Sequence, residues 1–453
     1  MKALKLTPYP AYKTSGVGWL GDVPAHWETS RSKWLFRKME RSVKTGDDVV
    51  TCFRDGVVTL RKNRRVRGYT ESLKEIGYQG IIKGDLVIHT MDAFAGAAGV
   101  SDSDGKGTSV YSVCTPRNEC VNPYYYAFCV REMARSEWIL AHAKGIRERS
   151  TDFRFNVFAS QIVPFPPLPE QNAIVRYLDN ATERIRRYIN AKERLINLLE
   201  EQRQAVIHRA VTRGLDPNVR LKPSGVEWLG DVPTHWKISR IKAEFHSFNH
   251  RRVPLSTSER GAMSVRKYDY YGASGVIDKV EDYLFDDELL LIAEDGANLV
   301  LRNLPLAIIA RGKFWVNNHA HILKPRSGNL EYLAAVMEVL DYTPWISGAA
   351  QPKLTQDRLM DIAIAVPPRL EQDEIVAKVT EQTSPMRVIL DHARRQIDLL
   401  RKYRTRLVAD IVTGKLDVRM ATAHFPDDAE ELDALNEGEA LNIAQYTEPE
   451  KVK

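Results

Sequence analysis

The stretch LRKNRRVRG at residues 60–68 is the densest group of cations in the sequence. Such a run binds a phosphate backbone by releasing its counterions, and an arginine or asparagine that reaches the major groove can make bidentate contacts to guanine or adenine. A solvated basic loop is the alternative, and we favour contact with DNA. The residues predicted to make this contact are Arg61, Lys62, Asn63, Arg64, Arg65 and Arg67.

Three further stretches mix cations with amide or aromatic side chains. KGIRERSTDFRF at 144–155 and GAAQPKLTQDRL at 348–359 hold comparable places in the two halves of the chain, and SVRKYDYYGASG at 264–275 places cations among tyrosines. A phenol adds stacking area and a hydrogen bond to a groove contact, but core packing, of Tyr271 and Gly272 above all, is an equal alternative. The predicted contacts are Lys144, Arg147, Arg149, Arg154, Arg266, Lys267, Tyr268, Tyr270, Asn317, Asn318, Gln351 and Lys353.

Three motifs imitate catalytic or cofactor-binding sites. FAGAAG at 94–99 lacks the glycine spacing of a cofactor loop, and NPYY at 122–125 lacks the second proline of a motif that holds a flipped adenine. GVSDSDGKG at 99–107 has the wrong spacing for a phosphate-binding P-loop, and the four cysteines form no C-x-x-C pair. We therefore predict reduced structural thiols and no catalytic residue, metal or cofactor on this chain.

The charge of the chain is unevenly distributed. The formal net charge is +6, but residues 421–453 hold nine acids and two lysines, which leaves 63 cations against 50 anions in the rest. A body this basic favours a polyanion or an acidic partner, with a solvated basic surface as the alternative. The apolar runs are far shorter than a membrane span and the first residues lack a signal core, so we expect a cytoplasmic protein without a membrane partner.

Two duplicated phrases predict how these residues are positioned. SGVGWLGDVPAHW at 15–27 returns as SGVEWLGDVPTHW at 224–236, and PPLPEQNAIVRYLDN at 166–180 returns as PPRLEQDEIVAKVTE at 367–381. The chain is therefore a globular segment and a helical segment, each present twice. Glycine and proline in the first phrase are expected to shape a turn. We predict buried anchors rather than base-stacking groups at Trp19, Trp27, Trp228 and Trp236.

The helical segments have coiled-coil spacing, because apolar residues recur at alternating intervals of four and three. A long helix with an apolar stripe needs a partner, and we prefer antiparallel pairing within the chain over a homodimer. Pro385 is expected to displace or kink the second helix near its start. The predicted stripe is Ile174, Leu178, Ala181, Ile185, Tyr188, Leu195, Leu199 and Val206 in the first helix and Val379, Met386, Ile389, Ala393, Leu400 and Leu407 in the second.

The globular segments have mixed patterns. We predict buried strands at 85–90 and 288–296 and helices at 122–143 and 329–343. The predicted fold class is α+β, with two repeated mixed α/β domains joined by a pair of long antiparallel coiled-coil helices.

This layout resembles the specificity subunit of type I restriction-modification systems over residues 12–420. Besides the repeated tryptophan phrase, the resemblance rests on YYGASGVIDKVEDYLFDDELLLIAEDGAN at 270–298, WVNNHAHILKP at 315–325 and QPKLTQDRLMDIAIAVPP at 351–368. The first half departs from this pattern, because GYQGIIKGDLVIHTMDAFAGAAG at 77–99 stands where YYGASG is expected. That departure fits two domains that read different DNA sequences.

The resemblance implies a non-catalytic specificity subunit with two DNA target-recognition domains and two spacer helices. Each domain would read one half of a split target in double-stranded DNA, with half-site centres about 10 base pairs apart. Two methyltransferase subunits would carry S-adenosylmethionine, and optional motor-nuclease subunits would use ATP and magnesium. The implied ranges are 1–167 and 214–367 for the domains, 168–213 and 368–420 for the helices, and 421–453 for an acidic tail that we expect to be disordered.

Two other classes of function stay open from the sequence. A coiled-coil adaptor without a nucleic-acid role would explain the helices but not the basic body or the two variable globular segments. A stand-alone DNA methyltransferase would need the cofactor motifs that fail above.

Overall fold

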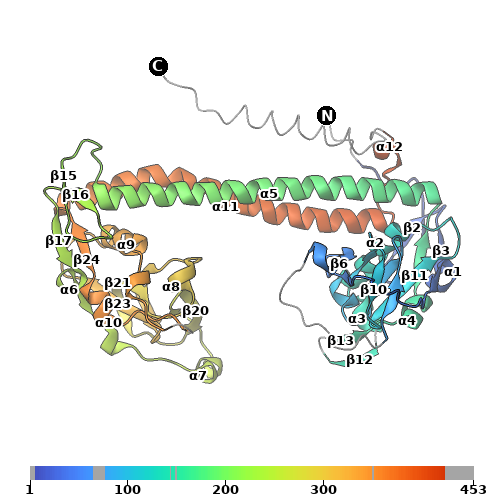
Figure 1. Ribbon diagram of the computed structural model, residues 1–453, viewed down its shortest axis with the longest axis horizontal. Helices are drawn as coiled ribbons and strands as arrows, with labels where there is room; N and C mark the ends of the chain where they lie inside the picture. The colour runs from blue at the N-terminus through green and yellow to red at the C-terminus, as the bar shows by residue number, and fades with distance from the viewer. Residues whose placement is uncertain (1–5, 65–76, 143, 148–149, 349–350, 424–453) are drawn as a thin grey trace, which may run out of the picture. The chain divides into compact units, whose positions relative to one another are not determined.

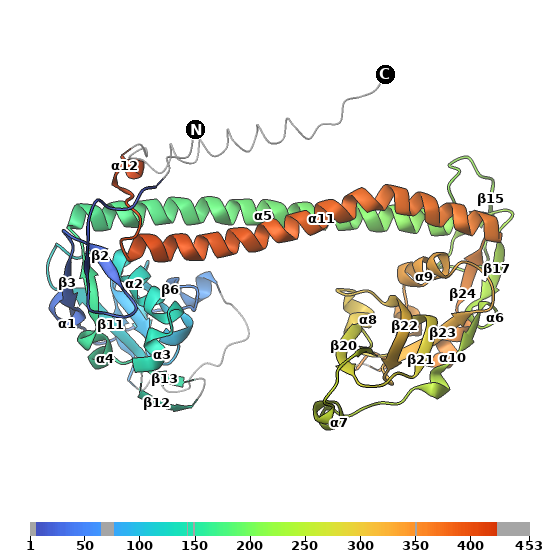
Figure 2. The same cartoon turned by 180° about the vertical axis from the view of Figure 1, so that it is seen from behind.

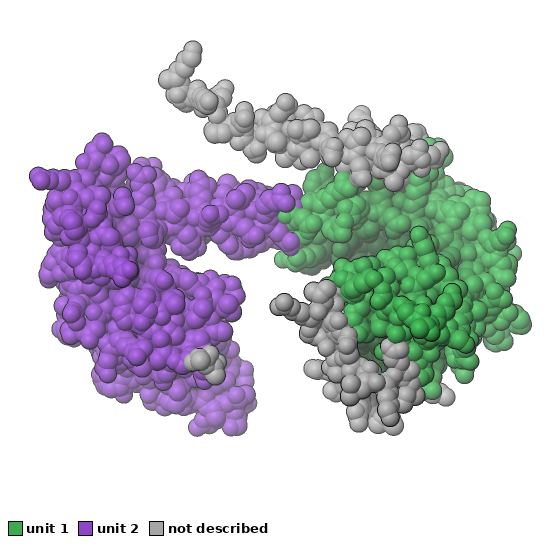
Figure 3. Space-filling view, in the orientation of Figure 1, with its two compact units in different colours: residues 1–190, 397–453 green, residues 191–396 purple. Residues whose placement is uncertain are grey.

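The computed structural model describes residues 6–64, 77–142, 144–147, 150–348 and 351–423 (Figure 1). The chain divides into two compact units, which Figure 3 shows in separate colours. Unit 1 comprises residues 1–190 and 397–453, and unit 2 comprises residues 191–396. We call residues 6–167 of unit 1 head 1 and residues 214–367 of unit 2 head 2.

Two long helices, α5 (Leu168–Arg213) and α11 (Arg369–Val412), contribute to both units. Unit 1 holds the first part of α5 with the last part of α11, and unit 2 holds the remaining parts, so the helices pair antiparallel in each unit. Figures 1 and 2 show them side by side. In unit 2, Arg394 Nη2 donates to Glu200 Oε1 across the pair at 2.5 Å. The predicted fold class is thereby confirmed.

The buried stripe of the helix pair differs in part from the predicted one. Three predicted members are exposed, namely Tyr188, Leu195 and Ile389, and Ile189 is buried in place of Tyr188. An α-helix has 3.6 residues per turn, so a strict 3.5-residue pattern drifts off the contact face as it is extended. The buried members are Ile174, Leu178, Ile185 and Ile189 in α5 and Leu390, Ala393, Ile397 and Leu407 in α11.

Pro385 lies in the interior of α11, and the helix is continuous around it rather than displaced at its start. The hydroxyls of Thr383 and Ser384 donate to the carbonyls of Val379 and Thr380 at 2.7 and 2.6 Å. Such back-bonding bends a helix locally and so makes room for the proline ring. The helix ends at Val412 and not near residue 420, because Gly414 adopts a left-handed φ of +77°.

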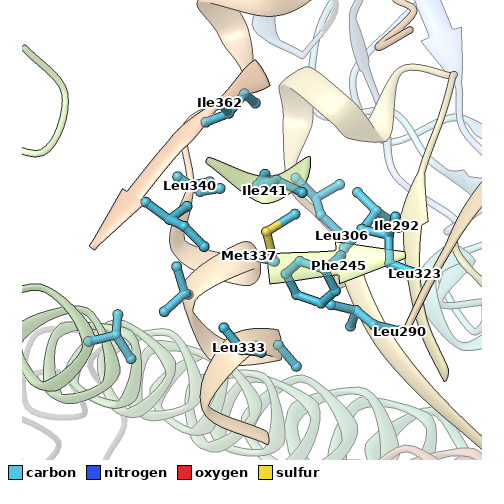
Figure 4. Packing of buried hydrophobic residues seen from close by; sticks show 14 of the residues in the cluster. Ile241, Phe245, Leu290, Ile292, Leu306, Leu323, Leu333, Met337, Leu340 and Ile362 are labelled. Carbon is cyan, nitrogen blue, oxygen red and sulfur yellow. The ribbon is translucent and has the colours of Figure 1, made fainter. Parts of the chain in front are cut away.

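Head 2 is built on a six-stranded sheet in the order β18-β23-β21-β22-β19-β20. Neighbouring strands are antiparallel except β19 and β22, which are parallel. Helix α9 (Leu330–Val339) covers one face, where Leu333 and Met337 pack against Leu290 and Ile292 (Figure 4). The strands are β18 (Phe245–Ser247), β19 (Tyr268–Gly272), β20 (Gly275–Val280), β21 (Phe285–Ala293), β22 (Ala307–Val316) and β23 (Ala320–Pro325).

Head 1 repeats four of these strand positions. Its sheet has the order β4-β11-β8-β9, which corresponds to β18-β23-β21-β22 of head 2, and all its pairs are antiparallel. In place of β19 and β20 of head 2, head 1 has the hairpin β5–β6. A parallel bridge between Val58 of β6 and Ser101, which directly follows β9, joins this hairpin to the sheet. The strands are β4 (Phe36–Lys38), β5 (Val50–Cys52), β6 (Val58–Leu60), β8 (Leu86–His89), β9 (Ala98–Val100) and β11 (Tyr111–Pro116).

The predicted strands at 85–90 and 288–296 correspond to β8 and to the end of β21, but both predicted helices are too long. Residues 122–143 form α2 (Pro123–Arg135) and α3 (Trp138–His142), because Glu137 interrupts the helix with a φ of +59°. The predicted helix at 329–343 is α9, which ends at Val339.

Short elements complete both heads. In head 1 they are β1 (Tyr12–Thr14), β2 (Asp22–Pro24), β3 (Glu28–Arg31), α1 (Ser32–Leu35), η1 (Arg61–Asn63), β7 (Gln79–Ile81), η2 (Ala93–Ala95), β10 (Gly105–Gly107), β12 (Lys144–Arg147), β13 (Ser150–Asp152), α4 (Phe155–Ser160) and β14 (Ile162–Phe165). In head 2 they are β15 (Leu221–Pro223), β16 (Asp231–Pro233), β17 (Lys237–Arg240), α6 (Ile241–Glu244), η3 (Asn249–Arg251), α7 (Thr257–Ala262), α8 (Asn298–Leu301), η4 (Thr343–Trp345), α10 (Gln356–Asp361) and β24 (Ala363–Val366). Helix α12 (Arg419–Thr422) follows α11.

The repeated tryptophan phrase binds the helix ends to the heads. In unit 1, Glu170 at the start of α5 accepts hydrogen bonds from Trp27 Nε1 at 3.0 Å and from the Tyr9 hydroxyl, and it pairs with His26 Nε2 at 2.9 Å. Gly414, just after α11, lies so close to Trp27 that an added Cβ would stand 2.9 Å from its Cζ3. We call this arrangement the unit 1 latch.

Unit 2 repeats the latch with the helices exchanged. Glu371 at the start of α11 accepts from Trp236 Nε1 at 3.0 Å and pairs with His235 Nε2 at 2.7 Å, while Gly214 after α5 packs on Trp236. Trp19, Trp27 and Trp236 are buried as predicted, whereas Trp228 is half-buried. Each phrase therefore joins the start of one long helix to the end of the other.

Candidate nucleic-acid interface

Four loops of head 2 meet around the carboxylate of Glu294, which directly follows β21. Arg252 Nη1 donates to Glu294 Oε2, and Lys353 Nζ lies 3.2 Å from Glu294 Oε1. The backbone N–H of Glu294 donates to His319 O at 2.9 Å, and its carbonyl accepts from Leu354 N at 2.8 Å. We call the loops at 248–254, 294–297 and 317–319 and the described residues 347–348 and 351–354, which these bonds join, the Glu294 cluster.

The Glu294 cluster holds its central acid in the charged form. Burial by itself raises the pKa of Glu294, but the bonds from Arg252 and Lys353 hold that pKa below its usual range. A carboxylate that accepts bonds from two cations on different loops ties those loops together.

A buried histidine supports the cluster from beneath. His321 is 1% exposed, and burial lowers its pKa. Asn249 Oδ1 accepts from Ile322 N, which fixes the amide so that Nδ2 donates to His321 Nδ1 at 2.8 Å. His321 Nε2 therefore carries the proton and donates to Leu354 O at 2.8 Å. The ring is neutral and links β23 to two of the four loops.

The Glu294 cluster brings together four residues that the sequence singled out. Asn318, Gln351 and Lys353 are exposed, and Lys353 is paired with Glu294. Asn317 is only 5% exposed, and its Oδ1 accepts from His319 N at 2.8 Å. Its side chain therefore shapes the turn between β22 and β23, and the predicted DNA contact of Asn317 does not agree with its burial.

A second group of predicted residues lies at the start of β19, away from the Glu294 cluster. Tyr268 is half-buried and packs against Tyr283 with ring centroids 5.1 Å apart. Lys267 Nζ lies 5.2 Å from the Tyr268 ring, and Lys313 Nζ lies 4.5 Å from the Tyr283 ring. Two lysines over a partly exposed aromatic pair can hold a phosphate beside a stacking surface.

The two other predicted residues of this stretch have partners within head 2. Arg266 is exposed and donates to Asp278 Oδ1 at 3.1 Å. Tyr270 is 1% exposed, and its hydroxyl accepts from Leu255 N at 3.0 Å. Tyr270 is thus a core residue, and its burial does not agree with the predicted DNA contact.

In head 1, the predicted basic stretch begins with η1, and two of its described cations, Lys62 and Arg64, are held by acids. Lys62 Nζ lies 2.5 Å from Asp48 Oδ2, and Arg64 donates to both oxygens of Asp55 at 3.0 and 2.7 Å. The bonds from Arg64 hold the pKa of Asp55 below its usual range. The pairs are solvent-exposed, so a phosphate can replace the acid at small cost.

The other predicted residues of head 1 are described in part. Asn63 is exposed, and its Nδ2 donates to Thr59 Oγ1 at 2.9 Å; Arg61 is half-buried. Arg154 is exposed and donates to Asp152 Oδ1 at 2.7 Å. Lys144 and Arg147 belong to β12, of which only the backbone is described. Arg65, Arg67 and Arg149 lie outside the described residues.

The sequence analysis missed Arg252, Glu294 and His321 of the cluster and Tyr283 and Lys313 beside β19. The acids of AEDG at 293–296, directly after an apolar run, were a signal for a polar site at a strand end. The contribution of Arg252 had no signal, because 42 residues separate it from Glu294.

Unit 1 contains a cavity of about 870 Å³ between α2 and the two long helices. Arg131 and Arg404 line it, and burial lowers the pKa of Arg131. Asp55, Asp179 and further acids line it too. Walls of mixed sign do not favour a polyanion, so we do not include this cavity in the interface.

Two properties concern the described part of the chain as a whole. None of its helices combines the length and apolarity needed to cross a membrane, and it holds no group of three or more histidine, cysteine or acidic side chains able to bind a metal ion. Three of the four cysteines are buried, and burial raises the pKa of the Cys52 thiol to about 12.

Parts of this chain are similar to known proteins. A family model described as the type I restriction modification DNA specificity domain matches residues 233–384. A curated Haemophilus influenzae protein named as a type I restriction enzyme specificity subunit is 36% identical over 130 residues, which are 28% of this chain and 32% of that protein. This match thus spans about a third of the relative's length.

Two longer similarities cover most of the chain. A Methanocaldococcus jannaschii protein, also named as a type I restriction enzyme specificity subunit, is 20% identical over 426 residues, 88% of this chain and 96% of that protein. A chain from a solved structure on complex assembly and conformational transition of a type I restriction-modification system has a TM-score of 0.64 at 15% identity, covering 87% of this chain and 99% of that one. Residues 233–384 thus match the DNA specificity domain of type I restriction-modification systems, and most of the chain is similar to a protein named as a specificity subunit of such a system.

Proposed function

We propose that this chain binds a bipartite target in double-stranded DNA, with one head for each half-site, and positions methyltransferase subunits on it. The observation that carries the proposal is the contrast between the repeated scaffold and the unrepeated loops. Both heads share a four-strand order and a latch. At the strand ends, by contrast, head 2 has the Glu294 cluster and the β19–β20 hairpin, and head 1 has η1 and the β5–β6 hairpin.

This contrast favours recognition over a purely structural role. A coiled-coil adaptor needs one docking surface. It does not require two heads that share a scaffold but differ in their polar loops. Phosphate contacts fix the position of a protein on DNA, and contacts to base edges specify the sequence. We assign the phosphate contacts to the exposed cations of both heads, including Lys62, Arg64, Arg266 and Lys267.

The long helices supply a surface for the methyltransferase partners. Apolar side chains that are exposed on a helix pair mark a site of protein contact. The chemistry belongs to the partners in this proposal: the methyltransferase binds S-adenosylmethionine and flips the target adenine, and a motor-nuclease subunit, where present, uses ATP and magnesium. The exposed apolar residues are Tyr188, Leu195 and Leu198 on α5 and Leu370, Val388, Ile389, Leu399 and Tyr403 on α11.

The test is to co-express the chain with the methyltransferase subunit encoded beside it and to map modified bases across the host genome by long-read sequencing. We expect a split motif with methyladenine in both halves that disappears when this chain is omitted. If an active methyltransferase assembles with the chain and no motif appears, the proposal is wrong and the adaptor becomes the better explanation.

A further inference from the structure

We propose that Asn318 and Gln351 are base-reading residues of head 2, and that the Glu294 cluster positions them to recognise adenine. This inference rests on the proposed function, because it assigns the contacts by which one half-site is read. Both side chains are exposed polar amides on loops of the same cluster.

Most other polar side chains of the cluster have hydrogen-bond or ion-pair partners, and the His250 ring is stacked on Phe248 with centroids 6.1 Å apart. Lys353 and Arg252 are bound to Glu294, and His319 Nδ1 lies 2.8 Å from Asp295 Oδ2. Among the described residues, the side-chain amides of Asn318 and Gln351 have no hydrogen-bond partner. They are therefore the side-chain amides of the cluster whose donor and acceptor are both available to a ligand.

Backbone hydrogen bonds lie close to both amides. Arg252 Nη1 donates to the carbonyl of Asn318 at 3.3 Å, and Asn317 N donates to Tyr271 O at 3.0 Å. Close to Gln351, Ser347 and Lys353 exchange two backbone hydrogen bonds at 2.8 Å, and Gly296 N donates to Pro352 O at 3.0 Å. A base-contacting residue whose backbone is already held in place loses less conformational entropy when the protein binds DNA.

The chemistry of a carboxamide selects the ligand. Its oxygen and nitrogen match the N6 donor and N7 acceptor that adenine presents in the major groove, whereas cations match guanine. Lys353, on the same loop as Gln351, is bound to a buried carboxylate and is thus a positioning residue in this scheme. We infer that the half-site read by head 2 contains two adenines, one recognised by each amide.

The experiment compares Asn318→Ala and Gln351→Ala with Asn303→Ala, which removes an exposed amide of head 2 outside the cluster. Each variant is assembled with the methyltransferase and bound to a library of duplexes that is randomised in both half-sites. We expect each reader variant to lose about 5- to 150-fold discrimination at one adenine position. The other half-site and the spacer length stay unchanged, and Asn303→Ala behaves as the wild type.

A conservative variant tests the chemistry itself. Asn318→Asp keeps the shape of the side chain but leaves only acceptors, and an acidic side chain accepts from the N4 donor of cytosine. We expect the preferred base at the affected position to change from adenine to cytosine. This change separates base reading from a general loss of loop structure, which would weaken binding at all positions together.

The outcomes distinguish this inference from the proposed function. If the wild type selects a split motif and both alanine variants keep every base preference within twofold, the assignment of Asn318 and Gln351 is overturned while the proposed function stands. If the wild type selects no motif although the complex assembles, the proposed function fails and the inference fails with it.

Discussion

Removal of the central carboxylate of the two latches is expected to have unequal effects. Glu170 is 4% exposed and Glu371 is 24% exposed. Glu170→Ala leaves both Trp27 Nε1 and the Tyr9 hydroxyl as buried donors without an acceptor, while His26, with a side chain 41% exposed, regains water. An unsatisfied buried donor costs about 1–3 kcal/mol, so the loss is about 4 kcal/mol for two donors.

The second latch has one buried donor fewer. Asn218 stands where the repeat would place a counterpart of Tyr9, and it is exposed. Glu371→Ala therefore strands only Trp236 Nε1, because the side chain of His235 is 46% exposed. We expect a loss of about 2 kcal/mol, about half of that in unit 1.

Hydrogen exchange followed by mass spectrometry measures both effects locally. Exchange accelerates about tenfold for each 1.4 kcal/mol of lost local stability. Peptides over residues 20–27 and 408–414 should exchange roughly a thousandfold faster in Glu170→Ala, and those over 207–214 and 229–236 about thirtyfold faster in Glu371→Ala. Glu170→Gln, which keeps one acceptor, serves as the matched control. Equal acceleration in the two variants, or acceleration in both units at once, would refute the reasoning.

Four other perturbations have defined outcomes. Pro385→Ala should slow hydrogen exchange over 378–390, because an exposed proline inside a helix costs up to about 3 kcal/mol. Burial lowers the pKa of His321, so the neutral ring stabilises head 2 fully above pH 6.5, and this stabilisation is lost as the pH falls below 6.5. The urea midpoints of unfolding at pH 7.5 and 5.5 should therefore differ less in His321→Gln than in the wild type. Insertion of residues within 190–200 should change the spacer of the methylation motif and leave both half-sites intact. Lys62→Gln should weaken binding to all duplexes and reduce the salt slope by about one unit, measured in a salt titration.

The scaffold could be predicted from the sequence because it is duplicated and periodic. The tryptophan phrases gave the frame of two heads, and the repeated Glu-Gln pairs that begin at Glu170 and Glu371 marked the starts of the long helices. Burial of Trp27 and Trp236 also followed from repetition, because side chains that read different half-sites should differ between the repeats.

The candidate interface was predictable only as a set of stretches. Alternation in β19 puts Tyr268 and Tyr270 on the same face, so it does not predict that Tyr270 is buried while Tyr268 is partly exposed. The break at Glu137 lacked the glycine or proline that usually marks a helix end. The Glu294 cluster joins loops that are far apart along the chain, and its bonds arise only when the sheet order of head 2 brings the strand ends together.

The pairing of charges suggests how the two kinds of DNA contact are divided. Arg64 and Arg266 are bound to acids in solvent-exposed or partly exposed pairs, which contribute little to stability and can exchange an acid for a phosphate. Lys353 is bound to the buried Glu294, and its removal would leave a buried carboxylate with one cation fewer. Cations such as Arg64 and Arg266 can bind the DNA phosphates without rearrangement of a head. Lys353, by contrast, is needed to neutralise Glu294 within the folded head. Base reading in head 2 then depends on neutral side chains, and the exposed amides at its strand ends meet that requirement.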